Sequence, residues 1–328
     1  MFNNQTILVT GGTGSWGHEL VRQLLKYDPK EIRIFSRNES VQFSMKQEFD
    51  NNPKLHFLIG DIKEKDTLIE ACTGVDYVFH LAALKHVPVC EDQPIEALKT
   101  NVIGTQNVVD AAIQCKVRRV VYISTDKASS PSNFYGLTKT MGERLIIHAN
   151  TLDIDTRFVC VRGGNVLGTN GSVIHVFKKQ IEEKGKVGIT DINMTRFFLT
   201  IEDAIKLVFK ATFESIGGEI FVMKMPTCKI TDLASVLIEA SGKENVGMEI
   251  LGIRPGEKIH ELLFSEYESI NTISYNDEYY VILPSIHING LKEHYAQYQP
   301  VNLLNYNSSK GLMSKDEIKE MLQKGGFI

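Results

Sequence analysis

The chain has 328 residues, a net charge of −4 and 23% charged residues of both signs, which excludes the strongly basic composition of a typical nucleic-acid-binding protein. Its five cysteines are odd in number and contain no Cys-x-x-Cys spacing, so we predict neither a disulfide framework nor a metal site. No apolar run approaches the length of a membrane span, and the first five residues do not resemble a signal peptide, so we expect a soluble, cytoplasmic protein.

The first predicted strand runs directly into a glycine-rich loop. Thr6–Thr10 is short and apolar, and a helical pattern of apolar residues begins at Leu20. Glycines between a first strand and a first helix permit a tight turn and let the backbone approach a pyrophosphate, which the helix N terminus also attracts. We therefore predict a dinucleotide site with these contacts from the loop: Gly11, Thr13, Gly14, Ser15, Trp16 and Gly17.

The second predicted strand, Glu31–Phe35, bears on the choice of cofactor. An NAD site would place an acidic residue about 20 residues after the glycines, where it binds the ribose 2′-hydroxyl. Ser36 and Arg37 occupy this place instead, and a hydroxyl with a guanidinium suits a 2′-phosphate. We predict NADP, while Glu39 leaves NAD as the alternative.

The third and fourth predicted strands are each followed by residues suited to a ligand site. After Leu55–Ile59 come Asp61, which can meet an adenine amino group, and Ile62. After Val75–Leu81, two small residues leave room for a cofactor, and two polar residues can reach a substrate. These residues are Ala82 and Ala83, followed by Lys85 and His86.

The fifth predicted strand leads into the segment that carries the chemistry. The apolar run 120–123 is typical of a buried parallel strand, and open α/β sheets hold their ligands beyond the carboxyl ends of such strands. Tyr135 and Lys139 follow one helical turn apart, a spacing that suits hydride chemistry. Asp126 and Lys127 offer an acid and a base in the same loop.

A sixth predicted strand, Thr156–Val161, completes a strand–helix alternation. This pattern predicts an α/β fold with a Rossmann-like, doubly wound parallel sheet. Beyond it, short irregular segments carry Arg196 and Arg254, and guanidinium groups suit a diphosphate. Because no repeat or linker separates the two halves, we expect a smaller C-terminal substrate-binding domain interleaved with the first.

Four further motifs narrow the interpretation. With the glycine loop and the Tyr-x-x-x-Lys spacing, they resemble the extended short-chain dehydrogenases/reductases, and among these the soluble UDP-N-acetylglucosamine 4,6-dehydratases of bacterial amino-deoxysugar biosynthesis. The similarity extends from about Thr6 to Pro284. The motifs are Ala82–Pro88, Ser124–Ala128, Met194–Phe197 and Arg254–Lys258.

The resemblance implies a role for each candidate residue. Tyr135 and Lys139 form the hydride-transfer pair, Asp126 and Lys127 form the dehydration pair, and Thr125 binds the C4 oxygen. A tightly bound NADP, a UDP-sugar substrate and a homo-oligomer are also implied. The expected substrate contacts are Lys85, His86, Asn165, Arg196 and Arg254.

The resemblance also gives the expected domains. Residues 1–162, with parts of about 196–225, form the NADP-binding domain, and residues 163–195 and about 226–328 form the nucleotide-sugar-binding domain. Neither nucleic acid nor a membrane is an expected partner.

One motif departs from the family pattern. These dehydratases typically carry Arg-Tyr-Gly-Asn where this chain has Arg162-Gly163-Gly164-Asn165, so a pocket-lining ring is missing. Some relatives invert C5 and others retain it. The sequence therefore leaves the C5 configuration open, together with the sugar range, the oligomer size and the downstream pathway.

We expect three chemical steps with one bound cofactor. Oxidation at C4 acidifies the C5 proton, water is eliminated across C5 and C6, and the hydride returns to C6. Tyr135, acidified by the Lys139 ammonium, takes the C4-hydroxyl proton. Lys127, neutral through burial and the nearby Lys139, takes the C5 proton, while Asp126, held protonated in a closed pocket, protonates the leaving hydroxyl.

Two alternatives stay open. A nucleotide-sugar 4-epimerase shares the fold and the Tyr135–Lys139 pair, but it needs no acid and base for C5 and C6, so the Asp126–Lys127 pair argues against it. A non-catalytic NADP-sensing regulator would commonly lack the catalytic tyrosine. Tyr135, Lys139 and Thr125 are all present here.

Overall fold

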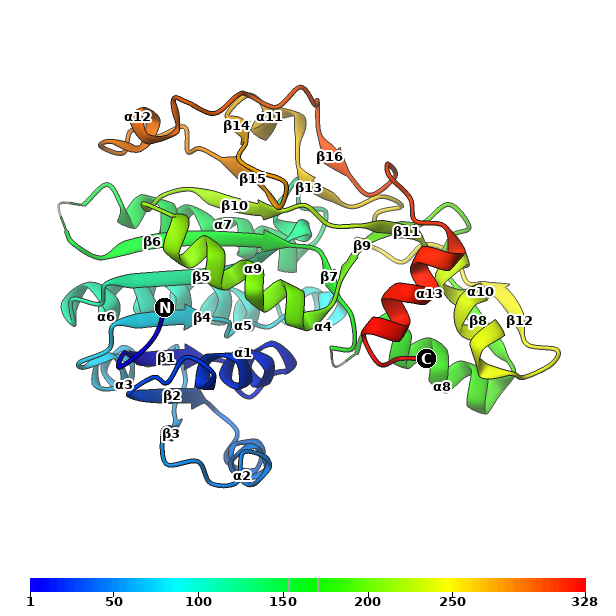
Figure 1. Cartoon of the computed structure of the whole chain (residues 1–328), viewed down its shortest axis with the longest axis horizontal. Coiled ribbons are helices and arrows are strands. Elements are labelled where there is room, and N and C mark those ends of the chain that lie inside the picture. Colours follow the sequence, from blue (N-terminus) through cyan, green and yellow to red (C-terminus); the bar gives the residue numbers. More distant parts are fainter. Residues whose placement is uncertain (153, 170) are drawn as a thin grey trace.

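The computed structural model describes residues 1–152, 154–169 and 171–328, and a nine-stranded sheet forms its centre (Figure 1). The sheet order is β14-β15-β10-β6-β5-β4-β1-β2-β3, and every pair from β10 to β3 is parallel. This order is that of a dinucleotide-binding fold and confirms the predicted doubly wound sheet. The parallel strands are β1 (Thr6–Thr10), β2 (Glu31–Ser36), β3 (Leu55–Ile59), β4 (Tyr77–His80), β5 (Arg119–Thr125), β6 (Arg157–Gly163) and β10 (Ile220–Met223).

The inner strands are mostly apolar and buried because helices cover both faces of the sheet. On one face α1 packs against α9, and on the other α6 packs against both α3 and α7. Val9, Val78 and Val121, from three neighbouring strands, are fully buried between these layers. The covering helices are α1 (Ser15–Leu25), α2 (Glu39–Glu48), α3 (Lys65–Cys72), α6 (Gly104–Gln114), α7 (Phe134–Ala149) and α9 (Ile201–Glu214).

A second, smaller core lies at the side of the sheet that also holds the C terminus (Figure 1). It is formed by the contact of α10 with α8 and α13, and by small sheets beside them. Phe177, Leu237 and Leu322 are among its buried residues. Its elements are β7 (Asn165–Val166), α8 (Val173–Lys184), β8 (Lys186–Ile189), β9 (Thr195–Leu199), β11 (Thr227–Lys229), α10 (Ile230–Ser241), β12 (Gly247–Ile250) and α13 (Lys315–Lys324).

The segment assigned to the second domain also contributes to the large sheet. β14 (Thr272–Ser274) and β15 (Tyr279–Ile282) add an antiparallel pair at its edge beside β10. The division into a cofactor domain and a sugar domain stays a proposal, which the two separate cores support. The other short elements are α4 (Val87–Asp92), α5 (Pro94–Leu98), the π-helix η1 (Lys99–Ile103), the 3₁₀-helix η2 (Asp126–Ala128), β13 (Leu262–Phe264), α11 (Glu266–Ser269), α12 (Leu291–Tyr295) and β16 (Tyr306–Asn307).

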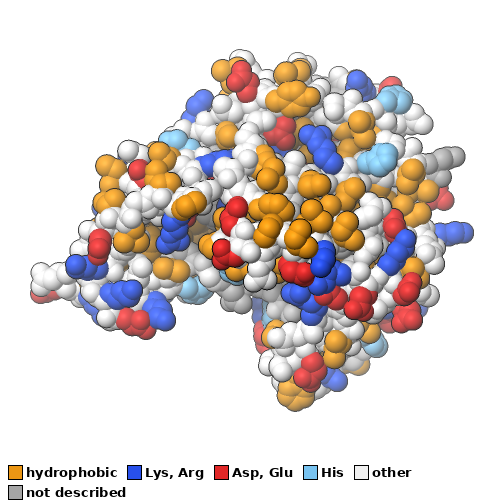
Figure 2. Space-filling view, turned by 180° about the vertical axis from the view of Figure 1, so that it is seen from behind, with side chains coloured by type: hydrophobic (Ala, Val, Ile, Leu, Met, Phe, Trp, Pro, Cys, Tyr) orange, Lys and Arg blue, Asp and Glu red, His pale blue; other side chains and the backbone are white. Residues whose placement is uncertain are grey.

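Hydrophobic side chains gather in the middle of the face seen in Figure 2. The helices α4, α5 and α7 lie on this side, behind the sheet in Figure 1. Their exposed hydrophobic residues, with one from η1, are Val89, Ile95, Ile103, Leu137 and Met141. Within the described residues, no helix has the length and apolar character needed to cross a membrane.

Candidate active site

A cleft of about 670 Å³ opens at the carboxyl ends of the parallel strands. It is lined by the glycine loop, by the ends of β2 and β4, and by the segment after β5. The structure thus brings together nearly all the residues that the sequence singled out. The exceptions, which do not line the cleft, are Gly17, Asp126, Arg196 and Arg254.

The glycine loop forms a close cradle at the N terminus of α1. Gly11 has a φ of +69°, and a Cβ on it would lie 2.7 Å from the backbone of Ala82, so the loop tolerates no side chain there. A Cβ on Gly17 would collide with the Gly12 carbonyl, so Gly17 acts by letting the helix approach the loop. The backbone is therefore shaped to approach a pyrophosphate, as the sequence predicts.

The end of β2 carries the residues expected at the adenosine ribose. The Ser36 hydroxyl accepts a hydrogen bond of 2.9 Å from the buried Gln42, which also donates to the Leu58 carbonyl. The Arg37 guanidinium is 58% exposed and lies 3.9 Å from the Asp61 carboxylate. Arg37 is thus mobile enough to turn toward a phosphate, because no short hydrogen bond holds it among the described residues.

A close approach of α7 to η2 assembles the catalytic segment. The Asn133 side chain caps α7 by accepting a 2.8 Å hydrogen bond from the Gly136 N–H, which fixes the helix start just before Tyr135. A Cβ on Gly136 would collide with the Lys127 carbonyl oxygen. Glycine at this position lets the tyrosine and the loop that carries Asp126 share one site.

Asp126 and Lys127 form an ion pair beside the cleft, which Lys127 lines and Asp126 does not. The Lys127 Nζ donates to the Asp126 Oδ1 at 3.0 Å, and the Thr125 hydroxyl donates to the same oxygen at 2.8 Å. Asp126 is fully buried, and its Oδ2 has no hydrogen-bond partner among the described residues. One carboxylate oxygen is therefore held by two donors, and the other is buried without one.

The expectation of a neutral Lys127 was wrong for this arrangement. Burial by itself lowers the pKa of Lys127, but the Asp126 and Glu261 carboxylates outweigh it and raise the pKa above the ordinary value. Glu261 lies 3.7 Å from the Lys127 Nζ. Lys127 therefore rests as an ammonium beside Asp126.

The structure also differs from the expectation that Lys139 acidifies Tyr135. Burial raises the pKa of Tyr135 to about 12, and the cation that opposes this rise is Lys127. The Lys139 Nζ donates to the Ile123 carbonyl at 2.6 Å and lies 3.8 Å from the centroid of the Tyr122 ring. Burial lowers the pKa of Lys139 to about 7. Among the described residues no hydrogen bond joins the Lys139 and Tyr135 side chains, and the pKa of Tyr135 owes its opposing cation to Lys127, so the expected acidification by Lys139 does not appear.

The expected substrate contacts divide into two groups. Lys85, His86 and Asn165 line the cleft. Arg196 is buried in β9, where it donates to the Thr195 and Ile259 carbonyls, and Arg254 is 66% exposed outside the cleft lining.

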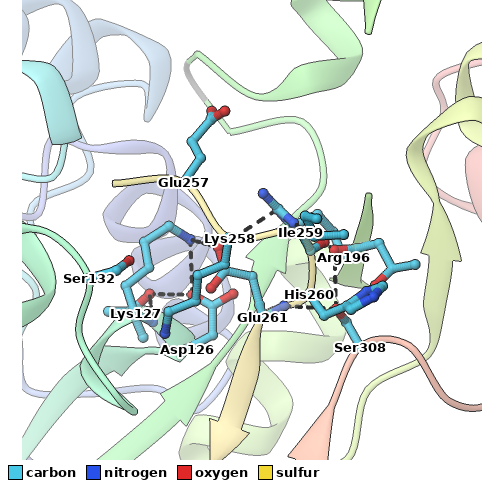
Figure 3. Close-up of polar contacts among 12 residues, drawn as sticks. Asp126, Lys127, Ser132, Arg196, Glu257, Lys258, Ile259, His260, Glu261 and Ser308 are labelled. Atoms are coloured by element: carbon cyan, nitrogen blue, oxygen red, sulfur yellow. Dashed lines mark hydrogen bonds and ion pairs between the residues drawn. The ribbon is translucent and has the colours of Figure 1, made fainter. Parts of the chain in front are cut away.

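Sequence reasoning missed two residues that meet the catalytic segment (Figure 3). Lys258 donates to the Ser129 and Ser130 carbonyls at 3.0 and 2.5 Å, and Glu261 faces Lys127. Lys258 belongs to a motif already singled out, but nothing in the sequence indicates that it contacts this loop.

The missing ring at position 163 leaves a space that sulfur atoms border. A Cβ on Gly163 would lie 3.3 Å from the Met223 Sδ and 3.9 Å from the Met225 Sδ. The Gly164 N–H lies 3.0 Å from the same Met225 Sδ. A side chain at position 163 would therefore press on the Met223 sulfur.

Comparison with known proteins gives a family match over most of the chain. A model of the family described as polysaccharide biosynthesis protein matches residues 7–283. The chain is 45% identical to a UDP-N-acetylglucosamine 4,6-dehydratase (inverting) of Campylobacter jejuni, over 87% of this chain and 85% of the relative. It is also 41% identical to a UDP-glucose 4-epimerase of Rickettsia felis, over 100% of this chain and 98% of the relative.

A solved structure agrees with both the fold and the length. The X-ray structure of Pen from Bacillus thuringiensis is 39% identical and has a TM-score of 0.91, covering 98% of this chain and 99% of that one. The resemblance inferred from the four motifs is thereby confirmed.

Proposed function

The chain belongs to the polysaccharide biosynthesis protein family, and we propose that it is a UDP-N-acetylglucosamine 4,6-dehydratase. Its product is a UDP-4-keto-6-deoxy-N-acetylhexosamine, with the C5 configuration left open. The observation that carries the proposal is the Asp126–Lys127 pair in the same site as Tyr135. The dehydratase relative from Campylobacter jejuni supports the same activity.

The cleft fits a nicotinamide dinucleotide because the glycine cradle and the small residues after β4 admit a pyrophosphate and a flat ring. We propose NADP over NAD, since Ser36 and the exposed Arg37 suit a 2′-phosphate. The chemistry that such a cofactor supplies when bound is acceptance of a hydride from C4 and its return at C6.

Tyr135 is the proposed base for the C4 hydroxyl, and Thr125 the group that hydrogen-bonds the C4 oxygen. A phenol must be deprotonated to accept a proton, and the pKa of about 12 disfavours this form near neutral pH. The Lys127 ammonium favours the phenolate. The C4 step therefore depends on the charge of the dehydration pair as well as on Tyr135.

The dehydration pair already contains the proton that elimination requires. Transfer of one proton along the 3.0 Å hydrogen bond from Lys127 to Asp126 converts the ion pair into a neutral amine and a carboxylic acid. Lys127 then takes the C5 proton while Asp126 gives its proton to the departing C6 hydroxyl, which leaves as water. This step ends in the ion pair from which it began. Return of the hydride to C6 leaves an enolate, and the Lys127 ammonium gives a proton to its C5 carbon. The proton that Tyr135 took from the C4 hydroxyl then restores the ammonium of the pair.

A direct experiment tests the activity. Purified protein incubated with UDP-N-acetylglucosamine should release a product lighter by one water, with deuterium at C5 when the reaction runs in deuterated water. Proton NMR of that product also gives the C5 configuration. A product of unchanged mass with an inverted C4 would contradict the proposal.

A nucleotide-sugar 4-epimerase is the second candidate, because the Rickettsia felis relative carries the name UDP-glucose 4-epimerase. Epimerisation at C4 needs no acid and base at C5 and C6. The buried Asp126 beside Lys127 would then have no chemical role, which favours the dehydratase.

We also propose that the protein is a homo-oligomer. The exposed hydrophobic residues on α4, α5 and α7 (Figure 2), including Ile95, Leu137 and Met141, support this. Light scattering of the purified protein would test it.

A further inference from the structure

Glu261 is a buried carboxylate placed between two cations of the site (Figure 3). It lies just before β13, with a side chain that is 4% exposed. Its Oε1 lies 3.7 Å from the Lys127 Nζ and 3.8 Å from the Arg196 Nε. Glu261 therefore faces the dehydration pair from the segment just before β13, which packs against η2.

Two hydrogen bonds with Ser308 hold the backbone at Glu261. Its N–H donates to the Ser308 hydroxyl at 2.9 Å, and the Ser308 N–H donates to its carbonyl at 2.9 Å. The Ser308 hydroxyl is in turn bonded to the Thr195 hydroxyl at 2.7 Å, next to Arg196. These hydrogen bonds fix the backbone position from which the carboxylate extends.

The carboxylate itself has few partners. Among the described residues neither of its oxygens accepts a hydrogen bond within the usual length, and the buried Oε2 has no partner at all. Burying a carboxylate without hydrogen bonds is costly, and here the nearby cations Lys127, Arg196 and Lys258 offset the cost. Such an arrangement is expected where the negative charge of the carboxylate acts on a neighbouring group of the site.

We propose that Glu261 is a positioning residue that holds the Lys127 amino group against Asp126 and stabilises the charge which Lys127 gains on taking the C5 proton. The inference rests on the proposed dehydratase function. Glu261 would act on Lys127 much as a buried carboxylate steadies a general base that becomes a cation.

The charges around Lys127 give the sign of the pH effect. Asp126 and Glu261 stabilise the Lys127 ammonium, whereas Arg196 destabilises it. The other ionisable side chains near this group are Lys258 and Tyr135. Removing the charge of Glu261 lets the dehydration pair lose its proton at a lower pH. A pair without that proton has no acid for the leaving hydroxyl. The alkaline limb of the pH–rate profile should therefore shift to lower pH.

A purely structural role predicts a different pattern. If Glu261 only neutralised Arg196, its loss would change stability or the KM for the nucleotide sugar. It would leave the pH profile and the isotope effect of the chemical step unchanged.

The test compares Glu261→Gln with the wild type as holoenzymes, using UDP-N-acetylglucosamine and its C5-deuterated form. We expect kcat to fall roughly tenfold or more. The alkaline limb of the pH–rate profile should shift to lower pH by about one unit or more. The isotope effect from deuterium at C5 should increase. Glu266→Gln, an exposed residue five positions on, is the matched control and should match the wild type. An unchanged kcat and alkaline limb in Glu261→Gln would overturn the inference.

Glu261→Asp provides the second variant in case the glutamine protein folds poorly. It keeps the charge while shortening the reach, so its alkaline limb should stay near that of the wild type although kcat drops. A downward shift as large as that of Glu261→Gln would overturn the inference. If the wild type itself forms no dehydrated product, the proposed function fails instead, which separates the two failures.

Discussion

Gly136 of α7 approaches Lys127 of η2 so closely that a Cβ on the glycine would collide with the lysine carbonyl oxygen. Substitution by alanine must push the helix away from the loop, and overpacking of this kind costs about 1–3 kcal/mol. We expect Gly136→Ala to lower the free energy of unfolding by this amount and to reduce dehydration strongly, because Tyr135 moves with the helix. Denaturant unfolding and product formation measure the two effects.

The control for this change is Gly247→Ala, at an exposed position in β12 where an added Cβ meets nothing within 4 Å. Its stability and activity should stay near those of the wild type. A Gly136→Ala protein with wild-type activity would show that the close contact is not needed for the site.

Lys127→Ala tests the proposed base. The change removes the group that takes the C5 proton, and loss of a general base typically slows a reaction by about 10²–10⁴-fold. Cofactor binding should persist because the glycine cradle is untouched, and cofactor titration measures it. Lys319→Ala, an exposed lysine of α13, is the control. Full activity in Lys127→Ala would exclude this lysine as the base.

The features that were predictable from sequence are those set by local patterns. The glycine loop lies between a strand and a helix, and Tyr135 precedes Lys139 by one helical turn, so each could be placed from neighbours alone. The strand predictions succeeded for the same reason, since β1 to β6 are short apolar runs with helices between them.

The features that were missed depend on contacts between distant segments. Glu261 meets Lys127 across more than a hundred residues of chain, and together with Asp126 it reverses the expected pKa shift of the lysine. Lys139 turns toward the Ile123 carbonyl, a choice between partners that spacing cannot reveal. Arg196 also donates hydrogen bonds to backbone carbonyls, and no local pattern indicates these partners.

Arg37→Ala tests the preference for NADP. A charge-assisted hydrogen bond to a phosphate is worth about 1.5–3 kcal/mol, so losing it should weaken NADP binding roughly 10- to 100-fold. NAD has no 2′-phosphate, and its affinity should change little. Fluorescence titrations of both cofactors on both proteins measure the ratio. Equal losses for the two cofactors would show that Arg37 does not read the 2′-phosphate.

Lys139 predicts how stability depends on pH. Burial lowers its pKa to about 7 in the folded protein, against about 10.4 in an unfolded chain. Between these values the unfolded chain binds a proton that the folded protein does not, so stability rises with pH by at most about 1.4 kcal/mol per unit. From pH 7.5 to 9.5 the wild type should gain up to about 2 kcal/mol more than Lys139→Met, in the same cofactor state. Denaturant unfolding at both pH values measures this difference in stability. The control Lys319→Met should behave like the wild type. Identical pH dependences for the wild type and Lys139→Met would show that Lys139 stays charged in the folded protein.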